Sequence, residues 1–198
     1  MKLILASNNE KKLKELREIL SEIGCEVYSQ REAGLDFTVD ETGETFRENA
    51  ALKAQAVVEK TGQAAIADDS GLMVEALDGA PGVHSAYYGG DACKTDRERF
   101  EYLLRQMENK ENRRAAFHST IVCIFPDGSQ IEAEGRLEGE ILKAPRGEGG
   151  FGYDPIFYVP QMGRTLAEMT AEEKNSLSHR GGALRKFKEK WEKTYADK

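Results

Sequence analysis

The sequence predicts an α/β domain built on a mixed sheet. Through the first half of the chain, apolar runs of strand length alternate with segments of helical periodicity, as in parallel strands joined by helices. A Pro-Asp-Gly-Ser turn at 126–129 then separates two strand-like runs, which predicts an antiparallel hairpin. No linker or internal repeat divides the 198 residues, so we expect a single domain over 1–198 with an ample core.

The chain opens with a strand, a helix and a second strand. Residues 2–6 form a short apolar run. Apolar residues then recur at helical spacing from 13 to 23, and Gly24 is a suitable helix stop. Residues 25–29 are again of strand type, so strand, helix and strand alternate at the start of the chain.

Three Thr-x-x-Glu sequences each predict the start of a helix, because the two side chains can cap the free N–H groups of the first turn. They begin at Thr45, Thr95 and Thr170, and Gly62 ends the first of these helices. A last helix is expected from Ser178.

The remaining strands are expected at 64–68, 114–125 and 130–137. The segment 77–90 is rich in Gly and Pro and is predicted to be a long surface loop.

Composition excludes several classes of protein. The net charge of −7 argues against a general nucleic-acid binder, whose surface would be basic. The apolar run at the N-terminus is too short for a secretion signal, and no run approaches the roughly 20 apolar residues of a membrane span. Cys25, Cys93 and Cys123 are odd in number and widely spaced, so we expect no disulfide framework, no zinc site and a cytoplasmic protein.

The segment SNNEKK (residues 7–12) is a candidate phosphate site. It joins a strand to a helix, where backbone N–H groups are free to bind an anion. Asn9 can donate through its amide, and Lys12 adds a mobile positive charge. Lys53 shares a face of the next helix with Asn49. A polar helix cap and two solvated lysines would explain the same residues equally well.

The adjacent carboxylates of AIADDSGL (residues 65–72) are a candidate metal site. Asp68 and Asp69 follow a small apolar run at a predicted strand end, and Glu41 lies in the acidic loop before them. Oxygen ligands of this kind suit Mg²⁺, which pairs one or two carboxylates with substrate phosphates. In the alternative interpretation the two aspartates cap a loop and accept backbone N–H groups near Ser70.

Two later segments offer groups for a base or sugar. Phe151 follows a glycine pair and presents a stacking face, and Asp154 is an acceptor. His179 and Arg180 fall in the first turn of the last helix, where exposed N–H groups favour carbonyl or phosphate oxygens. Ordinary packing and surface exposure are the alternatives for both segments.

Taken together and in order, these motifs closely resemble the inosine/xanthosine triphosphate pyrophosphatase family. The resemblance runs from Lys2 to Phe187. Several family members have Thr-Gly-Asn where this chain has Ser-Asn-Asn at 7–9. The matching segments are SNNEKK, ETGETFRENAALKA, AIADDSGL, GAPGVHSA, GGFGYDPIF and EEKNSLSHRG.

The resemblance implies an elongated mixed sheet flanked by helices, with two lobes around a central cleft, in a homodimer. It also implies Mg²⁺-dependent hydrolysis of ITP, dITP and XTP to the monophosphate and pyrophosphate. By the same resemblance Glu41 and Asp69 would ligate Mg²⁺, and Asp69 would be the catalytic proton acceptor. Residues implied to contact substrate are Ser7, Asn8, Asn9, Glu10, Lys11, Lys12, Lys53, Ser70, Phe151, Gly152, Tyr153, Asp154, Lys174, His179 and Arg180.

Two other functions were weighed against this one. A Maf-like pyrophosphatase acting on modified pyrimidine or methylated nucleotides would also bind triphosphate, but the segments SHRG and FGYDP favour the purine family. A nucleotide sensor without turnover would lose a metal carboxylate, whereas Glu41, Asp68 and Asp69 are all present.

Overall fold

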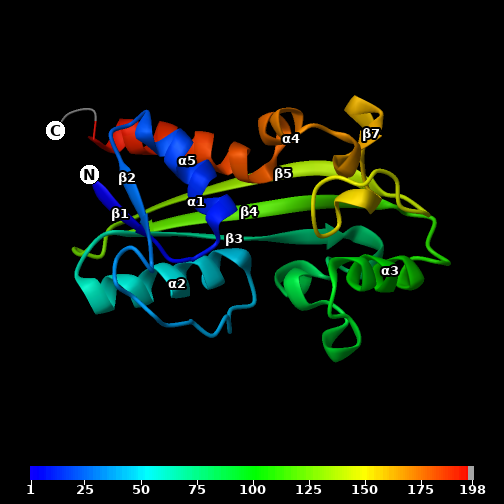
Figure 1. Ribbon diagram of the computed structural model, residues 1–198, viewed down its shortest axis with the longest axis horizontal. Helices are drawn as coiled ribbons and strands as arrows, with labels where there is room; N and C mark the ends of the chain where they lie inside the picture. The colour runs from blue at the N-terminus through cyan, green and yellow to red at the C-terminus, as the bar shows by residue number, and fades with distance from the viewer. Residues whose placement is uncertain (196–198) are drawn as a thin grey trace. The chain divides into compact units, whose positions relative to one another are not determined.

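A computed structural model describes residues 1–195 and contains one seven-stranded sheet, in the order β2-β1-β3-β4-β5-β6-β7 (Figure 1). The chain divides into two compact units. The first comprises Met1–Asp69, Ser119–Gly135 and the chain from Arg180 onward, and the second comprises Ser70–His118 and Arg136–His179. Strands β3, β4 and β5 therefore contribute residues to both units.

The elements have the following bounds. The strands are β1 Lys2–Leu5, β2 Glu26–Ser29, β3 Ala65–Val74, β4 Arg114–Ile124, β5 Gln130–Ile141, β6 Phe157–Val159 and β7 Arg164–Thr165. The α-helices are α1 Glu10–Ser21, α2 Phe46–Thr61, α3 Asp96–Gln106, α4 Ala171–Leu177 and α5 His179–Tyr195. Short 3₁₀ helices are η1 Glu75–Leu77, η2 Gly82–Tyr87, η3 Gly90–Ala92, η4 Asp154–Ile156, η5 Pro160–Met162 and η6 Leu166–Glu168.

In the first unit helices cover both faces of the sheet. Strand β1 pairs in parallel with β2 and with β3. Helices α1 and α5 lie on one face and α2 on the other (Figure 1). Because side chains alternate along a strand, Ile66 of β3 packs in the core with α1 and α5, whereas Ala65 and Ala67 pack with α2.

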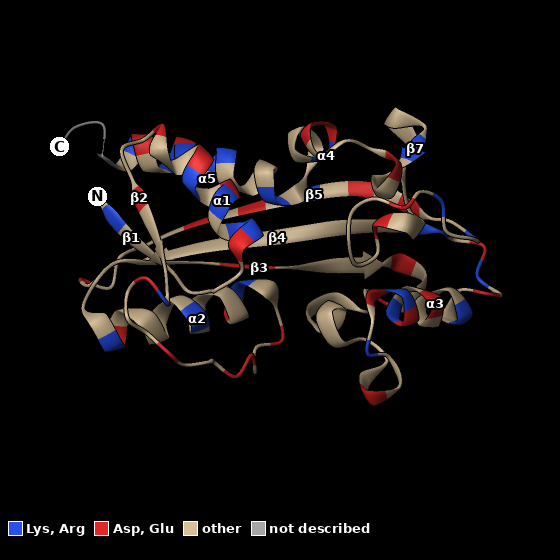
Figure 2. Ribbon diagram, viewed as in Figure 1, with Lys and Arg blue, Asp and Glu red and all other residues tan. Residues whose placement is uncertain are grey.

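The second unit has its own apolar core. Helix α3 contributes Phe100 and Leu103, and its C-cap is Met107; all three belong to one buried cluster with Leu72 of β3 and Phe157 of β6. Strands β6 and β7 extend the sheet by antiparallel pairing. Charged residues are concentrated on helices and loops, and within β3 they are confined to its two aspartates (Figure 2).

The predicted helix starts are confirmed. Thr45, Thr95 and Thr170 each form a capping box with the glutamate three residues later. Gly62 ends α2 in the left-handed conformation, which glycine adopts without steric cost.

Two predicted strand ends and one predicted loop are wrong. Strand β3 continues to Val74 instead of ending at Asp68, because helix side chains neutralise its aspartates within the sheet. Strand β5 runs to Ile141 and not to Leu137, since alternate residues remain buried to its end. The segment 77–90 is not a plain loop but contains η2, a short 3₁₀ helix that its Gly and Pro content permits.

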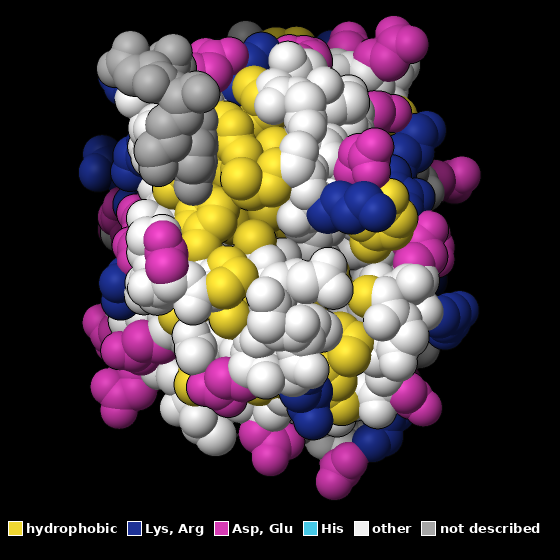
Figure 3. Space-filling view, turned by 90° about the vertical axis from the view of Figure 1, so that its left-hand side faces the viewer, with side chains coloured by type: hydrophobic (Ala, Val, Ile, Leu, Met, Phe, Trp, Pro, Cys, Tyr) yellow, Lys and Arg dark blue, Asp and Glu magenta, His cyan; other side chains and the backbone are white. Residues whose placement is uncertain are grey.

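The surface of the first unit includes an apolar area. Figure 3 shows hydrophobic side chains gathered on one end of the molecule, with acidic and basic side chains around them. Such groups of exposed apolar side chains are typical of contact surfaces. Among the described residues, none of the helices combines the length and apolar character needed to cross a bilayer.

Candidate functional site

The segment after β1 forms a capped turn at the start of α1. Asn9 is the N-cap, and its Oδ1 accepts hydrogen bonds from the backbone N–H groups of Lys11 and Lys12 at 3.0 and 3.2 Å. Ser7 Oγ accepts from Asn9 N at 3.1 Å. Glu10 is the first residue of the helix. The predicted strand–loop–helix geometry is therefore present, with the positive end of the helix facing the loop.

Asn8 lies in this turn without backbone strain. Asp78 is the sole described non-glycine residue with a positive φ, so Asn8 has an ordinary backbone conformation. Its Oδ1 accepts from the backbone N–H of Arg31 at 3.0 Å, which ties the loop to the segment after β2.

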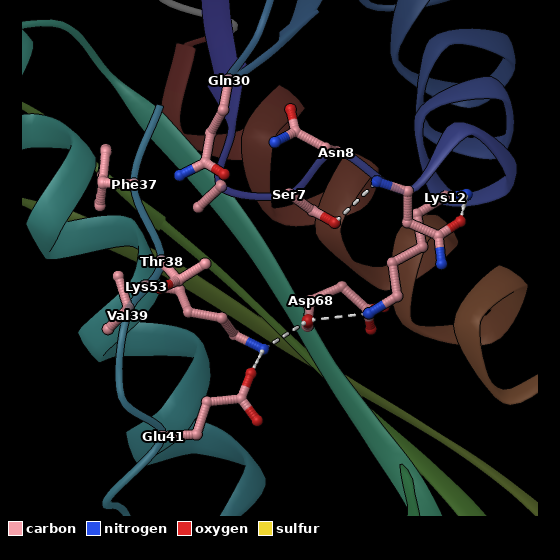
Figure 4. A pocket seen from close by; sticks show the side chains of 12 residues that line it. Ser7, Asn8, Lys12, Gln30, Phe37, Thr38, Val39, Glu41, Lys53 and Asp68 are labelled. Atoms are coloured by element: carbon pink, nitrogen blue, oxygen red, sulfur yellow. Dashed lines mark hydrogen bonds and ion pairs between the residues drawn. The ribbon is translucent and has the colours of Figure 1, made fainter. Parts of the chain in front are cut away.

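A cavity of about 370 Å³ opens beside this turn, within the first unit. It lies at the carboxyl ends of parallel strands, the usual place for a ligand in an open α/β sheet. Figure 4 shows side chains from the loop after β1, from α2 and from the segment before α2 pointing into it. Its lining residues are Ala6, Ser7, Asn8, Asn9, Lys12, Gln30, Phe37, Thr38, Val39, Glu41, Lys53 and Asp68.

The two adjacent aspartates serve opposite faces of β3. Asp68 continues the row of Ile66, which faces α1 and α5, and Asp69 continues the row of Ala65 and Ala67, which faces α2. Strand geometry, and not a loop cap, therefore decides which cations each carboxylate meets.

Asp68 is the centre of a buried charge network. Its side chain is 0% exposed. Oδ2 lies 2.9 Å from Lys12 Nζ and 3.0 Å from Arg180 Nε, and Oδ1 accepts a hydrogen bond from Ser119 Oγ at 2.6 Å. Glu15 of α1 holds the other side of the guanidinium, with Oε2 3.0 Å from Nη1. Both oxygens of Asp68 are thus engaged by protein groups.

Asp69 and Glu41 share one cation, Lys53 of α2. The Lys53 Nζ lies 2.9 Å from Asp69 Oδ1 and 2.8 Å from Glu41 Oε1 (Figure 4 shows the contact with Glu41). The two carboxylates expected to bind a metal therefore face the same point.

The two lysines meet at one backbone atom. Lys12 Nζ and Lys53 Nζ each donate to the carbonyl oxygen of Asp68 at 3.2 Å, from opposite sides (Figure 4). A single phosphate chain can therefore touch both ammonium groups. This convergence agrees with the predicted phosphate site and excludes the interpretation of both lysines as solvated surface side chains.

The aspartates differ in acidity as well as in direction. Burial alone would raise the pKa of Asp68, but Arg180, Lys12 and the Ser119 hydroxyl hold it well below its usual value. Burial raises the pKa of Asp69, and the single cation Lys53 only partly offsets this effect. Burial acts to lower the pKa of Lys53, yet Asp69 and Glu41 outweigh it and the pKa is raised. The cations that reach the two carboxylates therefore set their acidities apart.

The residues present fit a divalent cation. Asp69 Oδ2 is buried and accepts no hydrogen bond from any described residue. Together with Glu41 it supplies hard oxygen ligands beside two phosphate-binding lysines. Over residues 1–195 no group of three or more His, Cys, Asp and Glu side chains could hold a metal alone.

The second unit brings together Phe151, Asp154 and Lys174. Lys174 Nζ lies 2.5 Å from Asp154 Oδ2 and 4.2 Å from the ring centroid of Phe151, whose side chain is about half exposed. Asp154 Oδ2 also accepts the backbone N–H of Phe151 at 2.9 Å. A side chain at Gly150 would collide with the Asp154 carboxylate, so this turn requires glycine.

The neighbouring predicted residues have structural contacts of their own. Tyr153 is buried, and its hydroxyl donates to the Ser85 carbonyl at 2.8 Å. Gly152 donates its backbone N–H to Asp96 Oδ2 at 2.7 Å. The ring of His179 stacks on Phe117 with centroids 5.0 Å apart. Ser70 and Lys11 are partly buried and exposed, respectively.

Arg180 lies in different surroundings from the other residues predicted to contact the base. It belongs to the first unit, where Asp68 and Glu15 bind its guanidinium. A contact with the base remains a prediction for it, as for Phe151, Lys174 and His179.

Sequence reasoning missed several residues of the site. Gln30 and the segment 37–39 line the cavity, while Ser119 and Glu15 orient the charged groups. Gln30 directly follows β2, so its place after a parallel strand was an available signal. Ser119 and Glu15 lie inside regular elements and are identified only by their tertiary contacts.

A family model described as the Ham1 family matches residues 3–190. A dITP/XTP pyrophosphatase of Thermus thermophilus is 53% identical over 187 residues, covering 93% of this chain and 89% of the relative. One of Corynebacterium glutamicum is 50% identical over 199 residues, covering 96% of each chain. The solved Ham1 protein of Staphylococcus aureus matches with a TM-score of 0.91 and 40% identity, over 98% of this chain and 100% of that one.

Proposed function

Because the chain belongs to the Ham1 family, we propose that it hydrolyses the non-standard purine nucleoside triphosphates ITP, dITP and XTP to the monophosphate and pyrophosphate. Mg²⁺ is the proposed cofactor. One observation supports this most strongly: Lys12 and Lys53 converge on the Asp68 carbonyl beside the paired carboxylates of Glu41 and Asp69.

This arrangement matches the charge of the substrate. A triphosphate carries about four negative charges, and hydrolysis at the α-phosphorus adds charge to the leaving oxygen. Lys12, Lys53 and the N-terminus of α1 offer positive potential on one side of the cavity. Bound Mg²⁺ would supply further neutralisation of phosphate charge and make a nearby water more acidic.

Asp69 is the proposed proton acceptor. Its Oδ2 is buried and has no hydrogen bond from a described residue, so this oxygen is available to a water beside the metal. Asp68 is excluded from that role because its two oxygens are already bound by Ser119, Lys12 and Arg180. Asp68 instead holds Lys12 and Arg180 in position.

Base selection is assigned to donors that match the carbonyl at C6 of hypoxanthine and xanthine. Adenine has an amine at that position, so a site built around this hydrogen bond can discriminate by about 10⁴. Phe151 would stack on the base, with Lys174 close to it, and His179 is a further proposed contact. Guanine also has a carbonyl at C6, so a hydrogen bond to that carbonyl cannot by itself exclude GTP.

A substrate panel tests the proposal. Purified protein is mixed with ITP, dITP, XTP, ATP, GTP and modified pyrimidine triphosphates, with Mg²⁺ and with excess chelator, and both products are measured. We expect monophosphate and pyrophosphate from the first three nucleotides and no turnover with chelator. Equal rates on all purine triphosphates, preference for pyrimidines, or binding of ITP without pyrophosphate release would refute it.

We also propose a homodimer in the cytoplasm. The exposed apolar area of the first unit supports self-association, and the three free, buried cysteines suit a reducing compartment (Figure 3). Light scattering at micromolar concentration should give twice the mass of 22.1 kDa, and a monomeric mass would contradict the dimer.

A further inference from the structure

Lys53 occupies the point on which the two proposed metal ligands converge. Its ammonium is 2.8 Å from Glu41 Oε1 and 2.9 Å from Asp69 Oδ1. The side chains of Lys53 and Asp69 are only 12% and 11% exposed, so water weakens this contact little. One protein cation is therefore shared by both carboxylates and offsets one of their two negative charges.

We propose that Lys53 is the resident counter-ion of the Glu41–Asp69 pair and that a divalent cation binds the pair only by displacing it. This inference rests on the proposed function, which assigns the metal to these two residues. Mg²⁺ requires short, nearly octahedral contacts of about 2.1 Å with its oxygen ligands. Asp69 Oδ2 is not engaged by Lys53, but a divalent ion bound to it and to Glu41 would still lie close to the ammonium, and at this low exposure the two positive charges would repel each other strongly.

The structure also provides a place for the displaced ammonium. Lys53 Nζ already donates to the Asp68 carbonyl at 3.2 Å, the same oxygen that Lys12 binds from the other side. A small rotation of the side chain would turn the ammonium from the carboxylates toward a phosphate held between the two lysines (Figure 4). Phosphate binding would therefore draw Lys53 away from Glu41 and Asp69 at the same time as the nucleotide delivers the metal.

Two consequences follow for metal binding. The protein without nucleotide should hold Mg²⁺ or Mn²⁺ weakly, because the metal must compete with a cation of the protein itself. The same contact keeps Glu41 and Asp69 facing one another while no metal is bound, which preserves the geometry of the site. Lys53 is in this sense a positioning residue for the two carboxylates.

Lys12 provides a matched comparison. It carries the same charge, binds the same carbonyl oxygen and also lines the cavity, but its carboxylate partner is Asp68. Neutralising Lys12 therefore changes the local charge by the same amount without opening the Glu41–Asp69 pair.

The experiment measures Mn²⁺ binding without nucleotide, by electron paramagnetic resonance, for wild type, K53M, K53R and K12M. We expect K53M to bind Mn²⁺ about tenfold more tightly than wild type, or better, since the competing positive charge is gone. K53R and K12M should stay near the wild-type affinity. Circular dichroism checks that K53M is folded, and Mn²⁺ should raise its Tm more than that of wild type.

Other results would overturn the inference. If K53M binds Mn²⁺ no better than wild type, Lys53 does not compete with the metal. If K12M gains as much Mn²⁺ affinity as K53M, the gain comes from the loss of any nearby positive charge and not from the displacement of Lys53. The proposed metal site is checked separately, by measuring Mn²⁺ binding in the presence of the α,β-methylene analogue of ITP. If wild type binds Mn²⁺ under these conditions and E41Q does not, the metal site is supported even when the K53M result contradicts the displacement of Lys53.

Discussion

The adjacent aspartates of β3 should respond in opposite ways to the same substitution. We consider Asp68→Asn and Asp69→Asn, which each remove one negative charge and leave side-chain size almost unchanged. Asp68 is fully buried against Lys12 and Arg180, with Ser119 on its other oxygen. Asp69 has Lys53 as its cation, and Lys53 keeps Glu41 when Asp69 is neutral.

The expected magnitudes follow from burial. Removing one partner of a buried ion pair costs about 3–5 kcal/mol, because the remaining charges are left without compensation. For a chain of 198 residues each kcal/mol corresponds to about 2–4 °C in Tm, so D68N should lower Tm by about 6–20 °C. Burial raises the pKa of Asp69 despite Lys53, so its ionised form opposes folding, and D69N should change the free energy of unfolding by no more than about 1 kcal/mol.

The stabilisation of the fold by Asp68 should be lost in acid. The folded protein holds the pKa of Asp68 below its ordinary value of 3.8, so the carboxylate stabilises the fold at pH values above 3.8. That contribution is lost as the pH falls below this value toward the folded-state pKa. The Tm difference between wild type and D68N should therefore be constant from pH 8 to pH 5 and shrink in more acidic buffer.

Thermal unfolding of metal-free protein, followed by circular dichroism, measures these changes, and pyrophosphate release measures activity. D69N should keep its Tm and lose turnover. If D69N falls in Tm as far as D68N, or if D68N keeps the wild-type Tm, the assignment of the two carboxylates to opposite faces of the sheet is wrong. Normal activity of D69N would refute its role as proton acceptor.

Three further substitutions test separate parts of the site. Ser119→Ala removes a 2.6 Å hydrogen bond to a buried carboxylate and should lower the free energy of unfolding by about 1.5–3 kcal/mol, measured in urea, whereas an unchanged midpoint would contradict the network around Asp68. Glu41→Gln should raise the Mg²⁺ concentration needed for half-maximal turnover and leave the free energy of unfolding within about 1 kcal/mol of wild type. An unchanged metal requirement would remove Glu41 from the site. Phe151→Ala should raise KM for ITP about tenfold through lost stacking, with little change in stability because the ring is 52% exposed, and an unchanged KM would exclude base stacking there.

Local rules were enough to predict most of the fold. The Thr-x-x-Glu boxes at Thr45, Thr95 and Thr170 depend on residues three positions apart, and each begins a helix as expected. The boundary of β3 could not be predicted in this way. Two adjacent carboxylates inside a buried strand are stable only when cations from other elements reach them. Here these cations lie on α1, α2 and α5.

The same distinction between local and tertiary signals applies to the candidate site. Residues that follow a strand or begin a helix, such as Ser7, Asn9 and Lys12, were predicted from their position in the chain. Ser119 and Glu15 could not be, because a serine within a strand and a glutamate within a helix have no local feature that distinguishes them. Their importance arises only when folding brings them to Asp68 and Arg180.

A strand places the two lysines of the site more rigidly than a loop could. The alternation of β3 sends Asp68 to the face of α1 and Asp69 to the face of α2, so each carboxylate engages a lysine from a different helix. The peptide group between the two carboxylates offers its carbonyl oxygen to both ammonium groups. Because that oxygen belongs to a central strand of the sheet, its position is fixed by backbone pairing and not by side-chain rotamers. The spacing of Lys12 and Lys53 across the cavity is therefore set by main-chain geometry, which is the kind of support that a site for a chain of phosphates requires.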